Sequence, residues 1–195
     1  MAQVVVARLD VDSRPLLALL SAAEKKRAGR FRFERDRRRF TVARGRLREE
    51  LGTRLGVRPE RVALEYGENG KPRLAGRELH FSVSHCDDVA LLAFSKDAEI
   101  GVDLEAIRPV READAIATQF FTPAERAAYL ALAPRRRLLG FLRLWTRKEA
   151  FVKALGSGFS LPLERLDLSR APRGWRLHSF FPLRGFIGAL ACPHG

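Results

Sequence analysis

Gly101-Val102-Asp103-Leu104-Glu105 is the stretch that decides the fold, because it alternates apolar and acidic side chains with the period of a β-strand. The alternation turns Val102 and Leu104 into a core and sends the carboxylates of Asp103 and Glu105 from the opposite face. Isolated acidic pairs are common on solvated strand faces. This pair, however, lies near the presumed junction of two subdomains in a protein with few acids, and concentrated negative charge is repulsive unless a cation offsets it.

About forty residues later comes Trp145-Thr146-Arg147-Lys148-Glu149-Ala150-Phe151-Val152-Lys153, which has the spacing of a helix. Trp145, Glu149 and Lys153 share one side of that helix, one turn apart. Alone, Glu149 and Lys153 also fit a surface ion pair worth about 0.3 kcal/mol. Three carboxylates brought together, with a lysine one turn from the last, suit a hard divalent cation that keeps room for phosphate oxygens. The two stretches together predict phosphoryl chemistry.

The composition limits the class of protein. The chain has 195 residues, of which 46% are hydrophobic, enough for one large domain or two small ones. No apolar run reaches the roughly eighteen residues of a membrane span, and the first residues read as a strand and not as a secretion signal. With two cysteines and no Cys-x-x-Cys, a disulfide scaffold or structural zinc is not expected, and the cytoplasm is the predicted location.

The formal net charge of +13 comes mostly from arginine and favours a polyanionic or acidic partner. Nucleic acid, an anionic membrane surface, a phosphorylated cofactor and an acidic protein all satisfy that charge. A nucleic-acid-binding module is therefore the main alternative function, and it gives no reason for three acids at these positions. A magnesium-dependent phosphohydrolase with the same metal site is a second alternative.

The pattern of elements predicts an α+β protein with two subdomains, 1–97 and 98–195, and a cleft at their junction. Ser13 is expected to cap the first helix, and Thr122 with Glu125 forms a capping-box pattern. We expect strands at 3–9, near 64, at 79–84, 89–95, 100–105, 166–168, 175–180 and 186–191, and helices at 15–30, 36–55, 111–121, 123–132 and 134–155.

Two turns are candidate ligand-binding segments. Ser84 and His85 end a strand, where they either form a capped turn or donate hydrogen bonds to a phosphate. The turn at 67–72 is rich in glycine, so its open backbone could lie against a flat base while Lys71 supplies charge. Cys86 follows His85 directly, and sequence neighbours at a turn rarely form a nucleophile–base pair, which argues against a thiol hydrolase.

Three motifs, in this order and spacing, resemble the large, surfactin-synthetase type of 4'-phosphopantetheinyl transferase. They are Phe81-Ser82-Val83-Ser84-His85, the strand motif 101–105, and the helix motif from Leu144 to Gly156. The Gly70-Lys71-Pro72 turn and the basic segment at 24–31 also match. The resemblance covers the chain from about residue 21 to residue 163.

The resemblance implies a pseudo-two-fold pair of similar α+β subdomains, each a short antiparallel sheet with helices, holding coenzyme A and Mg²⁺ at their junction. It implies transfer of the 4'-phosphopantetheine arm to a serine of an acyl or peptidyl carrier protein with an acidic docking helix, and release of adenosine 3',5'-bisphosphate. The protein is then expected to be a monomer that needs neither nucleic acid nor a membrane.

Matching motif positions assign the roles. Asp103, Glu105 and Glu149 would be the metal ligands, and either Glu149 or a water on the metal would act as the base. Lys153 would neutralise charge on the leaving phosphate. The residues implied to contact coenzyme A are Arg27, Arg39, Tyr66, Lys71, Ser84, His85 and Lys153. Arg44 could share the phosphate role, and Leu104 stands where some members carry a third acid, so water would complete the metal shell.

Overall fold

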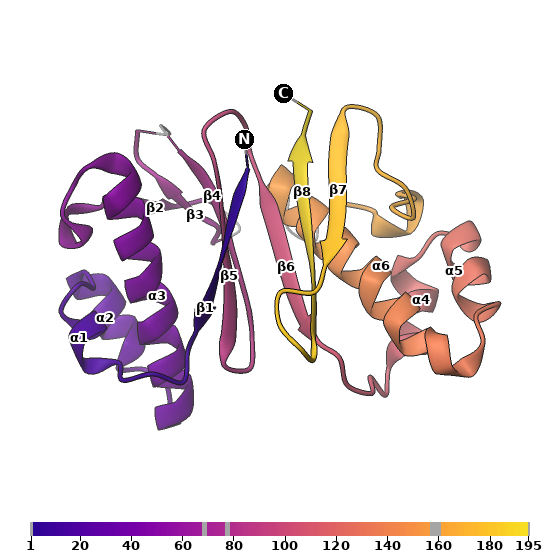
Figure 1. Ribbon diagram of the computed structural model, residues 1–195, viewed down its shortest axis with the longest axis horizontal. Helices are drawn as coiled ribbons and strands as arrows, with labels where there is room; N and C mark the ends of the chain where they lie inside the picture. Colours follow the sequence, from indigo (N-terminus) through magenta and orange to yellow (C-terminus); the bar gives the residue numbers. More distant parts are fainter. Residues whose placement is uncertain (1, 68–69, 77–78, 157–160, 195) are drawn as a thin grey trace.

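Two similar halves follow one another along the chain, each with one long helix and a three-stranded antiparallel sheet (Figure 1). The computed structural model describes residues 2–67, 70–76, 79–156 and 161–194. The first half contains β1 (Gln3–Arg8), α1 (Arg14–Leu17), α2 (Ala22–Ala28), α3 (Glu34–Leu55), the 3-10 helix η1 (Pro59–Arg61), β2 (Leu64–Tyr66), β3 (Pro72–Leu74), β4 (His80–Cys86) and β5 (Val89–Ser95). The second half contains β6 (Gly101–Ala106), α4 (Ala113–Phe120), α5 (Pro123–Leu130), α6 (Pro134–Leu155), the 3-10 helix η3 (Leu163–Arg165), β7 (Trp175–Phe180) and β8 (Phe186–Pro193).

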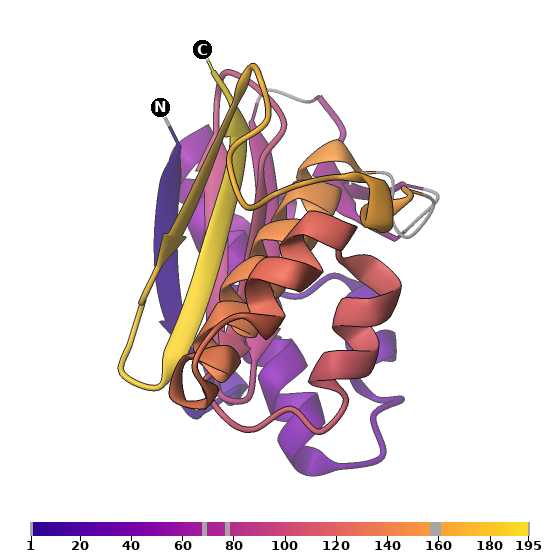
Figure 2. The same cartoon turned by 90° about the vertical axis from the view of Figure 1, so that its right-hand side faces the viewer.

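The two sheets have the same topology, which confirms the expected α+β fold with two related subdomains. Their strand orders are β1-β5-β4 and β6-β8-β7, so in each the first strand pairs with the second strand of a hairpin. The helices α3 and α6 are both 22 residues long, and each ends at a glycine in the left-handed conformation, Gly56 or Gly156. Figure 2 shows α4, α5 and α6 together beside the sheet of β7 and β8. The exact division at residue 97 stays a prediction.

The halves meet in a shared apolar layer. Buried side chains of β5 pack there against those of β6, and among the latter Val102 and Leu104 are almost fully enclosed. The hydroxyl oxygen of Ser82 on β4 also accepts the backbone N–H of Val102, at 3.1 Å. Strand β6 therefore lies at the junction with its apolar residues facing the core, as the alternation of its sequence predicts.

Three expected elements are wrong in detail. The single helix at 15–30 is two helices, because Ser21 adopts an extended backbone and forms a capping box with Glu24 that starts α2 afresh. Ser13 makes no capping hydrogen bond through its side chain. The strand at 166–168 is absent, and β3 was not anticipated.

Within the described residues, no helix is long and apolar enough to cross a membrane. Glu68 and Asn69 of the glycine turn, and residues 157–160 after α6, lie outside the described residues.

Gly101 allows β6 to approach α6 more closely than any other residue type would. A Cβ atom at this position would lie 1.8 Å from the backbone oxygen of Ala150 and 2.4 Å from the backbone nitrogen of Ala154. Both neighbours are backbone atoms, so no side-chain rotation could relieve the clash. Glycine at this position thus sets the distance between the strand that carries two acids and the helix that carries the third.

We expect Gly101→Ala to lower the free energy of unfolding by about 3 kcal/mol, because the added methyl group forces helix and strand apart. Denaturant titration followed by circular dichroism measures the loss. Gly29→Ala is the matched control: its backbone is right-handed and the nearest atoms to its added Cβ lie 3.6 Å away, so a change within about 0.5 kcal/mol is expected. Equal stability of Gly101→Ala and wild type would show that the close contact is not required.

Candidate functional site

Asp103 is the centre of a polar cluster at the junction of the halves. Its Oδ1 accepts hydrogen bonds from Lys153 Nζ at 2.6 Å and from Ser84 Oγ at 2.9 Å. Lys153 Nζ also lies 3.0 Å from Ser84 Oγ. The second oxygen, Oδ2, is buried and has no hydrogen-bond partner among the described residues. A buried carboxylate oxygen without a partner is costly, so this atom is available to a ligand that supplies positive charge or a donor.

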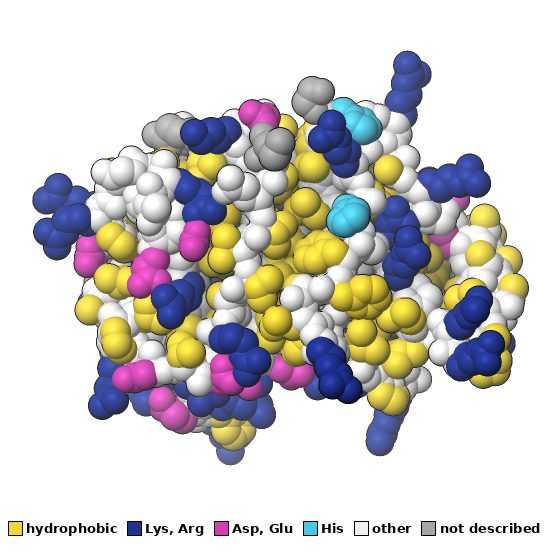
Figure 3. All heavy atoms as spheres, viewed as in Figure 1, with side chains coloured by type: hydrophobic (Ala, Val, Ile, Leu, Met, Phe, Trp, Pro, Cys, Tyr) yellow, Lys and Arg dark blue, Asp and Glu magenta, His cyan; other side chains and the backbone are white. Residues whose placement is uncertain are grey.

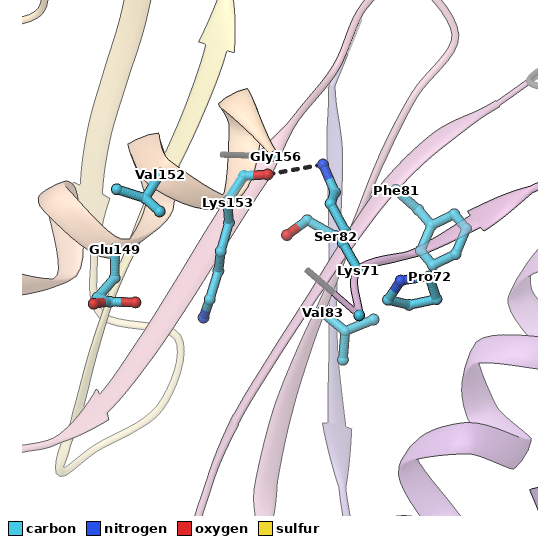
Figure 4. Close-up of a pocket in the computed structure, with 10 residues that line it drawn as sticks. Lys71, Pro72, Phe81, Ser82, Val83, Glu149, Val152, Lys153 and Gly156 are labelled. Carbon is cyan, nitrogen blue, oxygen red and sulfur yellow. Dashed lines mark hydrogen bonds between the residues drawn. The ribbon is translucent and has the colours of Figure 1, made fainter. Parts of the chain in front are cut away.

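Helix α6 supplies Glu149 and Lys153 from the same side, one turn apart, as the helical spacing predicts. Figure 4 shows both side chains extending in the same direction from α6, beside a cavity of about 260 Å³ that they line together with β4 and the Gly70–Pro72 turn. Both residues are half-buried. The cavity therefore receives side chains from both halves of the protein.

Burial and mutual repulsion both raise the pKa values of acids in the site. Burial raises the pKa of Glu105 above its ordinary value, and the charge of Asp103 raises it further, followed by a smaller contribution from Glu149. Burial also raises the pKa of Glu149, and Asp103 adds to that shift. Lys153 acts in the opposite direction on both. The site thus holds more negative charge than its single ammonium offsets, which favours a further cation.

The carboxylate oxygens of the site are ligands of the type that a hard divalent cation prefers, although the side chains are not arranged around a common point. Within the described ranges, no three His, Cys, Asp or Glu side chains are gathered closely enough to hold a metal ion. The ammonium of Lys153 occupies one oxygen of Asp103 instead. The buried Oδ2 of Asp103, without a partner among the described residues, and the carboxylates of Glu105 and Glu149, whose pKa values are raised, are oxygen donors of the kind that a hard divalent cation takes. Convergence of all three acids on one ion stays a prediction.

Ser84 and His85 lie beside this cluster within β4, which continues past the expected end at residue 84 to Cys86, and the two differ in exposure. Ser84 is buried, with its hydroxyl on Asp103. His85 remains exposed. Loss of surrounding water lowers the pKa of its ring, and the positive charges of Lys153 and Arg39 lower it further. The part of His85 in binding a phosphate stays a prediction.

Arg39 is committed to another partner. Its guanidinium donates two hydrogen bonds to the carboxylate of Asp88 in the β4–β5 turn, from Nε to Oδ1 at 3.0 Å and from Nη2 to Oδ2 at 3.1 Å. Arg38 also donates to Oδ1 of Asp88, at 3.1 Å. These contacts hold the turn that follows His85 against α3. The part of Arg39 in binding phosphate stays a prediction, and the structure gives it a clear role in positioning the turn.

Arg27 and Tyr66 lie along a second, larger hollow of about 910 Å³ between α2, η1 and β2. Cations and aromatic rings alternate beside it: Arg27 lies 5.2 Å from the ring centre of Phe40, and Arg44 lies 5.9 Å from Phe40 and 5.8 Å from Tyr66. Such a row combines charge with flat apolar surface, which suits a phosphorylated aromatic ligand. Arg44 belongs to this row and also pairs with Glu24, its Nε lying 3.5 Å from Oε1, so its part in binding phosphate stays a prediction.

Two interactions in the site were missed from the sequence. Lys71 donates to Glu99, an acid in the β5–β6 connection that no motif singles out. Lys148, next to Glu149, forms a fully buried ion pair with Glu125 at 2.8 Å. The pattern at 122–125 gave only the capping box, which is confirmed. Neither pairing could be found from spacing, because the partners meet only through the fold.

The pair of Lys148 and Glu125 joins α6 to its surroundings. The ammonium also donates to the backbone oxygens of Leu163 at 2.8 Å and Leu166 at 2.7 Å, while Glu125 Oε1 accepts the N–H of Leu168 at 2.7 Å. Every charged atom of the pair is thus hydrogen-bonded, as burial demands. The pair holds α6 through a different face from the one that carries Glu149 and Lys153.

Comparison with known families identifies both halves of the chain. Residues 99–185 match the 4'-phosphopantetheinyl transferase superfamily. Residues 11–97 match a second family, described as 4'-phosphopantetheinyl transferase, N-terminal. The two matched regions are adjacent, and the boundary between them falls in the connection that precedes β6.

Individual relatives agree with the family matches. The chain is 39% identical over 189 residues to the 4'-phosphopantetheinyl transferase HetI of Nostoc sp. (strain PCC 7120), with 90% of this chain and 79% of that protein covered. It is 31% identical over 154 residues to a 4'-phosphopantetheinyl transferase of Bacillus subtilis, covering 78% and 67% of the two chains. A Xenopus laevis L-aminoadipate-semialdehyde dehydrogenase-phosphopantetheinyl transferase is 32% identical over 161 residues, covering 76% and 53%.

Lys148→Met is expected to lower the free energy of unfolding by about 4 kcal/mol, because it leaves the Glu125 carboxylate buried without its counter-charge. Adding Glu125→Gln to this variant should recover part of the loss. Urea unfolding of the three proteins measures the effect, with the exposed Lys25→Met as control. A double variant no more stable than Lys148→Met alone would contradict this explanation.

Divalent cations are expected to stabilise the folded protein in a pH-dependent way. The folded-state pKa values of Glu105 and Glu149 lie above their unfolded values, so their stabilising contribution is complete below about pH 4.3 and is lost as pH rises through the raised pKa values. Mg²⁺ should therefore raise the thermal midpoint more at about pH 7.5 than at about pH 5, where protons compete.

Scanning calorimetry with and without Mg²⁺ tests this expectation, and Na⁺ at equal ionic strength is the control. Glu105→Gln should weaken the response to Mg²⁺. A shift of the same size with Na⁺, or one independent of pH, would show that the acids do not bind a divalent cation.

Proposed function

This chain belongs to the 4'-phosphopantetheinyl transferase superfamily and is an enzyme of that class, and we propose that it moves the 4'-phosphopantetheine arm of coenzyme A to a serine of a carrier protein. The observation that carries the proposal is the cluster of Asp103, Ser84 and Lys153, with Glu149 and Glu105 beside it, at the junction of the halves. Such a cluster suits a diphosphate, which needs both cations and hydrogen-bond donors.

The proposed reaction breaks the phosphoanhydride bond of the coenzyme A diphosphate and forms a phosphodiester on the carrier serine. The carrier serine Oγ forms a bond to the phosphorus that bears the pantetheine arm, and the bond from that phosphorus to the oxygen of the 5'-phosphate breaks. Adenosine 3',5'-bisphosphate leaves with the electron pair, and the serine proton passes to a base. Glu149 suits this step because its raised pKa makes its carboxylate a better proton acceptor near neutral pH.

Mg²⁺ is the proposed metal, with Asp103, Glu105 and Glu149 as the residues that would hold it. When bound, it would neutralise charge on the diphosphate oxygens. Lys153 is half-buried on the same side of α6 as Glu149, and its ammonium can stabilise charge on the leaving phosphate. Ser84 Oγ, 2.9 Å from Asp103, is placed to donate to a ligand once Asp103 turns to a cation.

The nucleotide end of coenzyme A is proposed to lie toward the first half. Arg27 is exposed there, and Arg27 and Tyr66 line the hollow of about 910 Å³. Behind them, Phe40 lies against Arg27, and Arg44 lies between Phe40 and Tyr66. His85 would lie nearer the reaction centre, where a bound phosphate would raise its lowered pKa and favour the protonated ring. The surfactin-synthetase subtype, a monomeric state and a cytoplasmic location stay predictions.

The carrier protein is proposed to be acidic on its docking face. Figure 3 shows lysine and arginine side chains around the face in view, with far fewer acids over the second half. Opposite charge on the partner would speed encounter more than it would tighten the complex. The same charge motivates the nucleic-acid alternative, which leaves the buried cluster around Asp103 unexplained.

Incubation of the protein with Mg²⁺, coenzyme A and apo-carrier proteins of several kinds is expected to add one phosphopantetheine group to the carrier serine, as seen by intact-protein mass spectrometry. Glu149→Gln should reduce kcat by roughly 10²–10⁴-fold, because it removes the proposed base and a metal ligand while keeping the shape of the side chain. Glu112→Gln, at the exposed N-cap residue of α4, is the control.

A carrier that stays unmodified across fatty acid, polyketide and peptide types would overturn the transfer proposal. Tight binding of duplex or single-stranded nucleic acid that falls steeply with salt would favour the alternative. Near-normal transfer by Glu149→Gln would remove Glu149 from the proposed roles.

A further inference from the structure

The ammonium of Lys71 closes a contact between the two halves of the protein. Its Nζ donates to the backbone oxygen of Lys153 at 2.8 Å, to Glu99 Oε2 at 2.8 Å, and more weakly to the backbone oxygen of Ile100 at 3.4 Å. Figure 4 shows Lys71 reaching across the cavity to this carbonyl in the last turn of α6. All three donor positions of the ammonium are thereby directed at protein atoms.

The carbonyl that Lys71 binds belongs to the C-terminal end of helix α6. The last four carbonyls of a helix have no partner within it, and a cation there also meets the negative end of the helix dipole. Helix α6 ends at Leu155, so the oxygen of Lys153 belongs to this set. An ammonium that is three-quarters buried, with its charge matched by Glu99, forms a stronger link there than a solvated one would.

The same residue, Lys153, carries the side chain at the centre of the site. Its backbone is held by Lys71, and its ammonium lies 2.6 Å from Asp103 and 3.0 Å from Ser84. A shift of the last turn of α6 would therefore move the ammonium relative to Asp103. The Gly70–Pro72 turn approaches α6 through this contact, so loss of it would release the turn as well.

We propose that Lys71 is a positioning residue: its ammonium, bonded to the backbone oxygen of Lys153, fixes the last turn of α6 so that the Lys153 side chain points at Asp103 and the reacting phosphate. The kinetic part of this inference rests on the proposed function. The expectation that Lys71 itself binds coenzyme A is the alternative, and it would require the ammonium to leave Glu99 and the backbone oxygens that it contacts in the free protein.

The first experiment needs no substrate. In ¹⁵N NMR of the lysine ammonium groups, Lys153 should give a hydrogen-bonded signal in the wild type, assigned by its loss in Lys153→Met. Lys71→Met should shift or abolish that signal. The signal of Lys148, whose ammonium is fully buried on Glu125, should stay unchanged and serves as the internal control. Lys96→Met, an exposed lysine before β6, should change neither.

The second experiment measures transfer. Lys71→Met should lower kcat by roughly 10- to 100-fold, because a small displacement of a reacting group has effects of that size. The KM for coenzyme A should stay within about twofold, since no contact to it is removed. Lys71→Arg, which keeps the charge and the reach, should recover most of the loss.

Several outcomes would overturn the proposal. One is a wild-type spectrum without a hydrogen-bonded Lys153 ammonium, and another is an unchanged Lys153 signal in Lys71→Met. A raised KM for coenzyme A with normal kcat would make Lys71 a direct ligand, and loss of the Lys148 signal as well would indicate general unfolding. If the wild type transfers nothing, the proposed function fails, while the spectra still decide whether Lys71 positions Lys153.

Discussion

The contact of β6 with α6 at Gly101 is the constraint on which the rest of the site depends. With no side chain at this position, the strand lies against the backbone of Ala150 and Ala154, the residues that directly follow Glu149 and Lys153 on α6. Asp103, two residues further along the strand, then points from the same face toward Lys153. A distance set by backbone atoms is rigid, which is what a site for charged groups requires.

Around this contact lie three carboxylates whose negative charge the neighbouring cations offset only in part. Burial and mutual repulsion raise the pKa values of Glu105 and Glu149, and one oxygen of Asp103 has no partner among the described residues. Lys153 offsets only part of this. Concentrated like charge in a half-buried site weakens the fold, and a ligand that supplies positive charge regains the difference as binding energy. This excess of negative charge supports the proposal that the site binds a cation.

The sequence predicted the elements that follow a clear period, together with much of the site. The alternation at 101–105 placed Asp103 on the face of β6 where Lys153 meets it, and the helical spacing at 145–153 put Glu149 beside Lys153. The prediction from hydrophobic periodicity was wrong where a local hydrogen bond interrupts a helix, as at Ser21 and Glu24, whose capping box starts a second helix. It also missed Glu99 with Lys71 and Glu125 with Lys148, because contacts between distant residues leave no trace in spacing.

Anomalous X-ray diffraction from crystals grown with Mn²⁺ and coenzyme A tests the central claim most directly, since Mn²⁺ replaces Mg²⁺ at sites of oxygen ligands. We expect one strong anomalous peak at about 2.0–2.3 Å from carboxylate oxygens of Asp103, Glu105 and Glu149, with phosphate oxygens completing the shell. A peak elsewhere, or none within reach of these three side chains, would contradict the assignment of this junction as the catalytic centre.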